Sequence, residues 1–487
     1  MRKGSRFGET NNTLMGSLVG FIQNQTYDRL PEELLKMATI HLYDTISVTL
    51  AGWHDQPVEI LKKEYCSSDT DFIQLLQHTK VEKNSIEAAA LIYGTASHSL
   101  DYDDAGVGVV MHPSAPVVSA ILPLSVQQPS IGKDVITAFV IGTEMIMRIG
   151  QLLHPHHYKL GWHSTSTIGV IGATAACAYL LQLNSEQCKN ALAMACSMSS
   201  GLQKNFGSMT KPLHVGLAAS NAIRIAKLAK QNFTGNERVF ETKGFLDAFT
   251  GGDHFDRIQA NIPNISFGDP FYYVEKGVSL KKFPCCFGNH RFIQATLNIL
   301  KNHSLSLDEI EEIILEAQQR SYQPLVHDRP TDGLQGKFSP EYTVLATVAD
   351  GAIRLNSFTD EMVQREKIQK LIPKVKRVEI KEEKDNHLLP VKITVKKDNG
   401  DILQESIQYP PGSKESPLSL DEMMDKWSDC IRHYFKQKEI SEQIYRGTKK
   451  LFAHCGQVDQ SQDVSQWLLD FQYYMNEMKE DGEAYHR

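Results

Sequence analysis

Apolar residues, chiefly Ala, Leu, Ile and Met, dominate successive segments of the first half of the chain. Examples are PEELLKMATIHLYDTISVTLAG, IEAAALIYGTASHSL and NSEQCKNALAMACSMSSGL, all within residues 13–250. The strict alternation of apolar and polar residues that is typical of half-buried strands is scarce there. The pattern predicts a series of helices over about 13–250.

One of these segments, TSTIGVIGATAACAYLLQL, is apolar on nearly all sides and rich in small residues. Such a helix is buried, and small residues let neighbouring backbones approach closely. We expect it to lie inside a helical bundle. The hydroxyls of WHSTST could cap its start, and LNSEQ is typical of the N-cap of a new helix, with a Glu in the first turn.

The pattern changes after about residue 270. FIQATLNILKNH predicts a helix, DEIEEIILEAQQR follows it, and KRVEIKEE and LPVKITVKKDNGDILQESIQYPPG alternate with the period of two expected of strands. Asn399-Gly400 lies between two alternating runs and predicts a hairpin, because a tight primed turn needs residues that tolerate positive φ. Helical texture returns at SPLSLDEMMDKWSDCIRHYF, where Ser419 or a neighbour could serve as the cap.

These patterns predict a mainly α protein with an inserted α/β lid. A chain of 487 residues exceeds the usual size of one domain, so at least two folding units are expected. We predict a helical domain formed by 1–275 and 413–487, and a smaller α/β lid domain at 276–412. The content of 41% hydrophobic and 22% charged residues is that of a globular protein.

Charge and targeting signals narrow the function further. A net charge of −7 gives no broad basic field for nucleic acid or an anionic membrane, so an anion would need a local cationic pocket. The start, MRKGSRFGETNNT, lacks the apolar stretch of a secretory signal, and no later run approaches the ~18 to 20 apolar residues of a membrane span. The eight cysteines form no CxxC pair. We expect a cytoplasmic protein with reduced thiols.

The first group of candidate residues is HSLDYDDAGVGVVMHPS, which places Asp101, Asp103 and Asp104 before His112 on one loop. An Asp can orient a His or share its proton, and an imidazole can donate or accept a proton near neutral pH. Alternatively, Asp103 or Asp104 caps the end of a helix and binds its own backbone. The spacing by itself leaves both interpretations open.

The second group is HPHHYKLGWHSTSTIGVIG, in which His163 precedes Ser164, Thr165 and Ser166 at the start of the buried helix. Backbone N–H groups at a helix N-terminus could bind a substrate carboxylate. The segment HPHH contains His154, His156 and His157, which could be metal ligands or part of a solvated loop. The solvated loop is favoured, because HPHH lacks the i, i+4 spacing of helical metal ligands.

The third group is NFGSMTKPLHVGLAAS, with Lys211 close to His214 in front of an Ala-rich helix. A lysine offers a point charge for a carboxylate, or a base if burial depresses its pKa. By itself this motif is more typical of a surface lysine whose stem lies along apolar surface.

Taken together and in this order, HSLDYDD with HPS, GWHSTSTIG and GSMTKPLH resemble the MmgE/PrpD family, which includes 2-methylcitrate dehydratase, cis-aconitate decarboxylase and iminodisuccinate epimerase. The resemblance covers about 13–455 and continues through KKFPCCFGNHRF and GKFSPEYTVLATVADG. It implies a homodimer with a large helical domain and a smaller α/β lid, a site between them, and no metal or organic cofactor.

Residue by residue, the resemblance implies a site in which Asp101, His112, His163 and Lys211 come from the helical domain and Tyr322 from QQRSYQPL in the lid. Lys281 and Lys282, which precede FPCC, could add charge for a substrate carboxylate, and Ser164 and Cys286 would also contact the substrate.

Two positions depart from the decarboxylase pattern and weigh against decarboxylation. Cys286 stands where a His is expected, and Ala105 where a Thr is expected. The segments GWHSTST and KNFGSMTKP resemble the iminodisuccinate epimerase branch of the family more than the decarboxylase branch. A nucleophilic Cys286 activated by His290 is conceivable, but a cysteine in such a run is more often a small buried hydrophobe.

The sequence therefore predicts a cofactor-independent lyase that acts on a small di- or tricarboxylate by proton transfer next to a carboxylate. The alternatives are an epimerase of an imino or amino dicarboxylate and a polycarboxylate-binding homologue without catalysis. No nucleic acid or membrane partner is expected.

Overall fold

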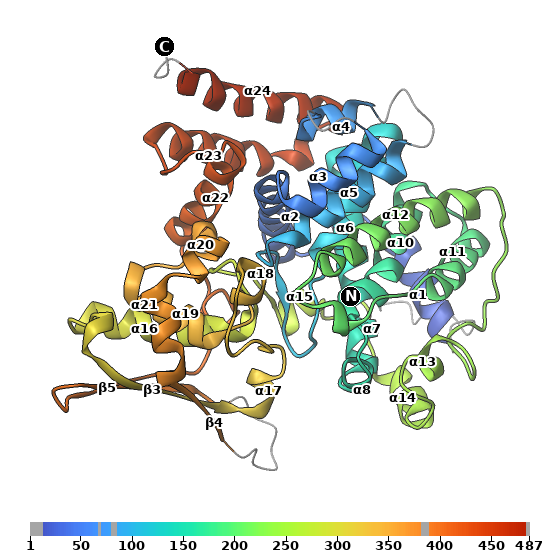
Figure 1. Cartoon of the computed structure of the whole chain (residues 1–487). Helices are drawn as coiled ribbons and strands as arrows, with labels where there is room; N and C mark the ends of the chain where they lie inside the picture. Colours follow the sequence, from blue (N-terminus) through green and yellow to red (C-terminus); the bar gives the residue numbers. More distant parts are fainter. Residues whose placement is uncertain (1–12, 67–69, 79–84, 381–388, 484–487) are drawn as a thin grey trace, which may run out of the picture. The chain divides into compact units, whose positions relative to one another are not determined.

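Helices account for most elements of the computed structural model, and strands form only small sheets in the part of the chain described (Figure 1). The structure describes residues 13–66, 70–78, 85–380 and 389–483. The predicted mainly helical fold with a smaller α/β part is confirmed. Residues 1–12 lie outside the described residues, so the expectation about a leader segment stays a prediction.

The chain divides into two units. Unit 1 comprises Met1–Ser99, Asp103–Val278 and Tyr434–Arg487, and unit 2 comprises Leu100–Tyr102 and Ser279–His433. Unit 2 begins close to the expected 276 but extends beyond the expected 412, because it includes nearly all of helix α22 (Leu420–Tyr434). Within unit 2, Lys426 Nζ of α22 donates to Tyr102 O at 3.0 Å, and Asp429 Oδ2 accepts from Leu355 N at 3.1 Å.

The helices predicted over 13–250 form the body of unit 1, and the last two helices described complete it. PEELLKMATIHLYDTISVTLAG contains α2, all but the last residue of IEAAALIYGTASHSL lies in α5, and NSEQCKNALAMACSMSSGL contains α11. The longer helices of unit 1 are α1 (Leu14–Asn24), α2 (Glu32–Gly52), α3 (Gln56–Tyr65), α5 (Ser85–Ser99), α6 (Ser114–Gln127), α7 (Gly132–Leu153), α10 (Gly169–Leu180), α11 (Ser185–Ser197), α12 (Thr210–Lys230), α23 (Glu442–Cys455) and α24 (Val464–Glu483).

Glycines allow the central helices of unit 1 to pack backbone against backbone. α5 packs along α12, and a Cβ built on Gly216 would lie 2.3 Å from Leu91 O. α10 packs on α7, and a Cβ on Gly172 would lie 2.4 Å from Gly142 O. The expected close approach of small residues is thus confirmed for α10.

The apolar segment that contains α10 is buried as predicted, but it is not one continuous helix. A short helix, α9 (Ser164–Thr167), ends at Thr167, and α10 begins at Gly169, so that Ile168 separates the two. The expected hydroxyl cap is wrong, because the N-cap of α9 is His163 and makes no side-chain cap bond. The next predicted cap is confirmed: Asn184 and Gln187 form a capping box at the start of α11.

Among the described helices, α7 alone is long and apolar enough to cross a membrane. No apolar run of that length was expected from the sequence. Within the protein, 94% of the most apolar window of α7 is buried. Such burial is typical of a core helix.

A four-stranded sheet forms one layer of unit 2. Its order is β4 (Val375–Ile380), β3 (Ile310–Gln318), β5 (Val391–Lys397) and β6 (Ile402–Ile407). β3 pairs parallel with β4 and antiparallel with β5, and β5 pairs antiparallel with β6. The segment DEIEEIILEAQQR thus supplies an inner strand of the sheet. The predicted hairpin is confirmed, with Gly400 at φ 87° between β5 and β6.

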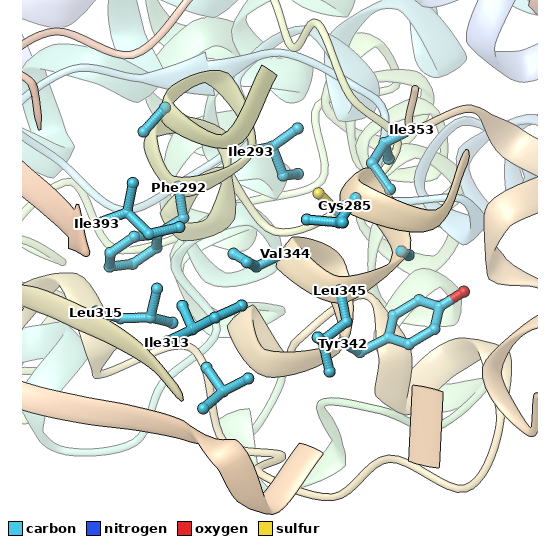
Figure 2. Packing of buried hydrophobic residues seen from close by; sticks show 14 of the residues in the cluster. Cys285, Phe292, Ile293, Ile313, Leu315, Tyr342, Val344, Leu345, Ile353 and Ile393 are labelled. Carbon is cyan, nitrogen blue, oxygen red and sulfur yellow. The ribbon is translucent and has the colours of Figure 1, made fainter. Parts of the chain in front are cut away.

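Two helices, α16 (His290–Asn302) and α19 (Pro340–Asp350), pack together, and α16 lies on β5 and β6. The side chains between the helices and the sheet form the core of unit 2, where Leu315 and Ile393 lie with Phe292 and Val344 (Figure 2). Ser419 and Glu422 exchange capping bonds at the start of α22, as predicted.

Candidate active site

His98, Asp103 and His112 meet inside unit 1, where α5 ends and the following loop leads to α6. Asp103 Oδ2 lies 2.7 Å from His98 Nδ1 and 3.5 Å from His112 Nδ1. The two imidazole rings are 4.8 Å apart in an edge-to-face arrangement. The side chains of His98 and Asp103 are fully buried, whereas that of His112 keeps 16% exposure. His112 is therefore the member of this group that solvent can reach.

His163 joins the group from the second motif. Its ring stacks on His98 at 5.5 Å, and its Nδ1 lies 3.1 Å from Nδ1 of His214. Burial holds the pKa of His163 well below its ordinary value, and His98, Lys211, His214 and His112 add like-charge repulsion. Burial, followed by Lys211, also lowers the pKa of His214. Both rings are therefore neutral near pH 7, and one Nδ1 donates to the other.

Lys211 brings the third motif to the same place. It lies in the first turn of α12, is only 6% exposed, and holds its Nζ 5.5 Å from the centre of the Phe206 ring. The same ring meets His163 edge-on at 5.0 Å. We call His98, Asp103, His112, His163, Lys211 and His214 the histidine cluster. The cluster unites the three motifs within unit 1.

Asp104 fixes the loop on which His112 lies. Its backbone oxygen is 2.5 Å from His112 Nδ1, while its carboxylate accepts from Ser114 N, from Ser114 Oγ and from His41 Nδ1 at 2.9 Å. Although burial opposes this, His41 and Ser114 lower the pKa of Asp104. Asp104 thus binds the first residue of α6 and does not cap the end of the preceding helix, which is what the alternative interpretation expected, and it also orients His112 through its carbonyl.

The hydroxyls that follow His163 hold neighbouring parts of the cluster. Thr165 Oγ1 accepts from the backbone N of His112 at 3.1 Å, and Ser166 Oγ donates to His214 O. Ser164, expected to bind substrate, is 4% exposed and begins α9. The WHSTST segment therefore joins the loop of His112 to the start of α12.

Asp101 lies in the three-residue part of unit 2 that interrupts the first motif. It has φ 55°, and Lys281 Nζ donates to its backbone oxygen at 2.8 Å and lies 3.2 Å from Oδ1. Lys426 donates to the next carbonyl, that of Tyr102, and holds its Nζ 4.4 Å from the centre of the Tyr102 ring. Two buried lysines therefore bind the backbone of this stretch.

The other candidates of unit 2 have contacts of their own. Tyr322 OH donates to Leu315 O at 2.6 Å, and burial raises the pKa of its phenol. Lys282 Nζ pairs with Glu422 at 2.7 Å. Cys286 is 8% exposed, and its backbone N donates to Lys337 O. Burial lowers the pKa of His290, which is fully buried.

Among the residues described, His98, Asp103 and His112 also have the composition of a transition-metal site, with ligand atoms within 4.8 Å of one another. Two ligands of a tetrahedral metal, each about 2.1 Å from it, would stand about 3.4 Å apart. The 2.7 Å between His98 Nδ1 and Asp103 Oδ2 is instead the length of a hydrogen bond. The histidines of HPHH lie elsewhere: His157 bonds Thr167 and Phe249, and His156 stacks on His254.

Three members of the histidine cluster were not among the predicted site residues. His98 ends a predicted helix, Asp103 was considered as a possible cap, and His214 was noted only as a neighbour of Lys211. His214 follows Lys211 by three positions on α12, so the two share one face of the helix, which is the signal that could have identified it.

Family models match most of the chain. The MmgE/PrpD N-terminal domain matches residues 16–258, and the MmgE/PrpD C-terminal domain matches 283–449. Similar curated proteins include a cis-aconitate decarboxylase of Homo sapiens, 28% identical over 70% of this chain and 71% of that protein. A cis-aconitate decarboxylase of Aspergillus terreus is 23% identical over 91% of this chain and 94% of its own length. A mitochondrial 2-methylcitrate dehydratase of Yarrowia lipolytica is 22% identical over 61% of this chain and 58% of its own.

Proposed function

The chain belongs to the MmgE/PrpD family, and on that premise we propose that it is a lyase acting on a small di- or tricarboxylate by proton transfer next to a carboxylate. The named relatives are a decarboxylase and a dehydratase of such acids. The observation that carries the proposal is the histidine cluster, in which Lys211 lies close to the neutral ring of His163, and His98 contacts the rings of both His163 and His112.

The chemistry of such acids explains why this combination of side chains fits. Loss of a proton or of carbon dioxide leaves an electron pair on carbon, which spreads into the oxygens of a neighbouring carboxylate. Fixed positive charge and hydrogen-bond donors stabilise that charge as it develops. Lys211 supplies the charge from a buried position, where its effect is less screened than in water.

His112 is the proposed group that transfers the proton. Its Nδ1 points to Asp104 O at 2.5 Å, so Nδ1 carries the hydrogen and Nε2 keeps the lone pair that accepts a proton. A positioned acid or base contributes about 10² to 10⁴ in rate. In this proposal Lys211 and His163 hold substrate carboxylates, and Asp101 influences the charge of an imidazole.

Tyr322 is the proposed donor of a second proton. Burial raises the pKa of its phenol, which therefore stays protonated near pH 7. The hydroxyl now donates to Leu315 O and would have to exchange this acceptor for the substrate. Lys281, Lys282, Ser164 and Cys286 are proposed substrate contacts. The same family membership is our basis for proposing a cytoplasmic homodimer that needs no metal or organic cofactor, with sedimentation analysis as the test of the dimer.

The test is turnover of cis-aconitate, 2-methylcitrate and citrate, followed by mass spectrometry for loss of carbon dioxide or water. Wild type should convert at least one acid, and His112→Ala should lose about 10² to 10⁴ in kcat. His303→Ala, which changes an exposed histidine outside the histidine cluster, is the matched control and should keep full activity. Inertness of wild type toward all three acids would reject the lyase, and an active His112→Ala would reject the role of His112.

An epimerase is the second candidate, because Cys286 and Ala105 depart from the decarboxylase pattern. The cluster offers more than one imidazole, and an epimerase needs two proton-transfer groups on opposite faces of one carbon. Hydrogen-deuterium exchange at the α-carbon of an amino or imino dicarboxylate, without elimination, would favour it. Tight binding without either reaction would identify a binding protein that has lost catalysis.

A further inference from the structure

Asp103 lies at the centre of the contacts among the imidazoles. Its Oδ2 accepts from His98 Nδ1 at 2.7 Å and faces His112 Nδ1 at 3.5 Å. Both Asp103 and His98 are at most 1% exposed, so water does not compete for these contacts. A carboxylate that is buried at this position must be paired, and two imidazoles surround it.

The contacts of His112 show how Asp103 can affect the tautomer and the charge of this imidazole. Asp104 O and Asp103 Oδ2 both face Nδ1 of His112, and both are acceptors. This arrangement favours the tautomer with hydrogen on Nδ1, and it stabilises the imidazolium that forms once Nε2 has taken a proton. The carboxylate of Asp104 is held by His41 and Ser114, whereas the carboxylate of Asp103 faces Nδ1 of His112.

His98 in turn orients Asp103. It comes from the last turn of α5, and its ring lies between two others, edge-to-face with His112 and stacked on His163. The packed ring leaves its Nδ1 directed at Oδ2 of Asp103. His98 therefore acts on His112 through the carboxylate that it holds.

We propose that Asp103 and His98 form a positioning pair for His112, in which Asp103 sets the tautomer and stabilises the charged form of the ring, and His98 fixes the carboxylate. This inference rests on the proposed function, because it gives His112 the transferred proton. For the ring of His112, Asp103 thus takes the role that the proposed mechanism would otherwise give to Asp101, namely setting the tautomer and charge of an imidazole.

Three variants test the pair. Asp103→Asn removes the charge while keeping the size of the side chain, and His98→Leu removes the donor. His98→Asn is the conservative variant, because its amide nitrogen can take the place of Nδ1 as donor to Asp103. We expect Asp103→Asn and His98→Leu to lower kcat about 10²-fold with little change in KM, and His98→Asn to restore most of the loss. Thermal unfolding of each variant shows whether it is folded.

The pH dependence separates positioning from a purely structural role. The titratable groups next to His112 are Asp103, Asp104, His98 and His163, and the electrostatic neighbours of His163 include Lys211. Removing the carboxylate makes the imidazolium less favourable, so the acidic limb of the kcat/KM profile should move to lower pH in Asp103→Asn. Loss of activity with an unmoved limb, or failure of His98→Asn to restore kcat in a folded protein, would overturn the pair.

A measurement on the ring itself distinguishes failure of this inference from failure of the proposed function. Histidine labelled with ¹⁵N and ¹³C, assigned with His112→Gln, reports the tautomer and the titration midpoint of His112 without any substrate. We expect hydrogen on Nδ1 in wild type and a lower midpoint in Asp103→Asn. An unchanged midpoint would overturn the pair even in an active lyase, whereas an inactive wild type with the expected shift would reject only the lyase.

Discussion

At the scale of single residues, Lys211 is buried and carries a positive charge that could bind a carboxylate of the proposed substrate. Its neighbours in the histidine cluster include two neutral imidazoles, and its Nζ lies over Phe206. A substrate carboxylate would therefore find a fixed ammonium in a cluster from which most water is excluded.

Lys211→Met keeps the length of the side chain and removes the charge. A hydrogen bond to a charged group is worth about 1.5 to 3 kcal/mol, so we expect KM to rise about 10- to 100-fold. Steady-state kinetics with the preferred acid measures this. Lys204→Met is the control, because Lys204 is exposed on the segment just before α12 and should tolerate the change. An unaltered KM for Lys211→Met would show that Lys211 does not bind the substrate.

The sequence could indicate only part of the site at this scale. His112, His163 and Lys211 stand in three motifs whose order resembles that of a family, and the structure brings them together. Asp103 was ambiguous because a carboxylate after a helix is common in caps, and only the tertiary contacts show its two imidazole partners. Asp101 shows the same limit, since its left-handed backbone and its contact with Lys281 depend on residues far along the chain.

At the scale of elements, close packing of α5 on α12 brings together the helix end that carries His98 and the helix start that carries Lys211 and His214. Gly216 makes this packing possible, because Leu91 O lies only 2.3 Å from where a Cβ would be. The two helices thus set the spacing of the histidine cluster.

Gly216→Val should separate α5 from α12. A built Cβ would lie 2.3 Å from Leu91 O and 2.5 Å from Thr95 Oγ1, so backbone must move. Overpacking of this kind costs about 1 to 3 kcal/mol or more, which urea unfolding would measure. The neighbouring Leu217 is 39% exposed, and Leu217→Ala should cost much less. Equal stability of Gly216→Val and wild type would contradict the close approach.

Helices and the hairpin were predictable because their signals are local. Continuous apolar texture identified α2, α5 and α11, and Asn399-Gly400 identified the β5–β6 turn. The break at Ile168 was not predictable, because the hydroxyls of WHSTST bond to distant partners such as the His112 backbone instead of capping the helix. The unit to which α22 belongs was not predictable, because its amphipathic pattern does not reveal which unit it packs in.

At the scale of the whole molecule, buried histidines determine how stability varies with pH. Burial lowers the pKa of His157 to about 4, and it also lowers those of His163, His214 and His290. Between about pH 4 and 6.5 the unfolded chain binds more protons at His157 than the folded protein, so the stability from its neutral ring is lost as pH falls.

Lowering the pH from 7.5 to 5 should therefore reduce the free energy of unfolding, with about 2 kcal/mol from His157 alone. Urea unfolding at the two pH values measures the difference. In His157→Gln the difference in the free energy of unfolding between the two pH values should be smaller by about 2 kcal/mol. His303→Gln changes an exposed histidine and should leave that difference as in wild type. Asp104, whose pKa is lowered below its ordinary value of 3.8, acts at lower pH and does not contribute in this window.

Dependence on metal is a property of the whole enzyme that a simple treatment can test. Because the His98–Asp103 distance is that of a hydrogen bond, we expect dialysis against a chelator to leave turnover unchanged. Adding Zn²⁺ to the dialysed enzyme should not increase its turnover. Loss of activity on dialysis that returns with one metal ion would show that the proposal of a metal-free lyase is wrong.

The discontinuity of unit 1 has a consequence for how the protein is made. His98 to His214 leave the ribosome early, yet α23 and α24, which pack on α2, α4 (Phe72–His78) and α6, are translated only after all of unit 2. A nascent chain that stops before residue 434 presents those apolar helix faces uncovered, a state prone to aggregation. Expression of chains that stop before residue 434 should yield insoluble protein. Unit 1 can therefore complete its folding only after α23 and α24 have been translated.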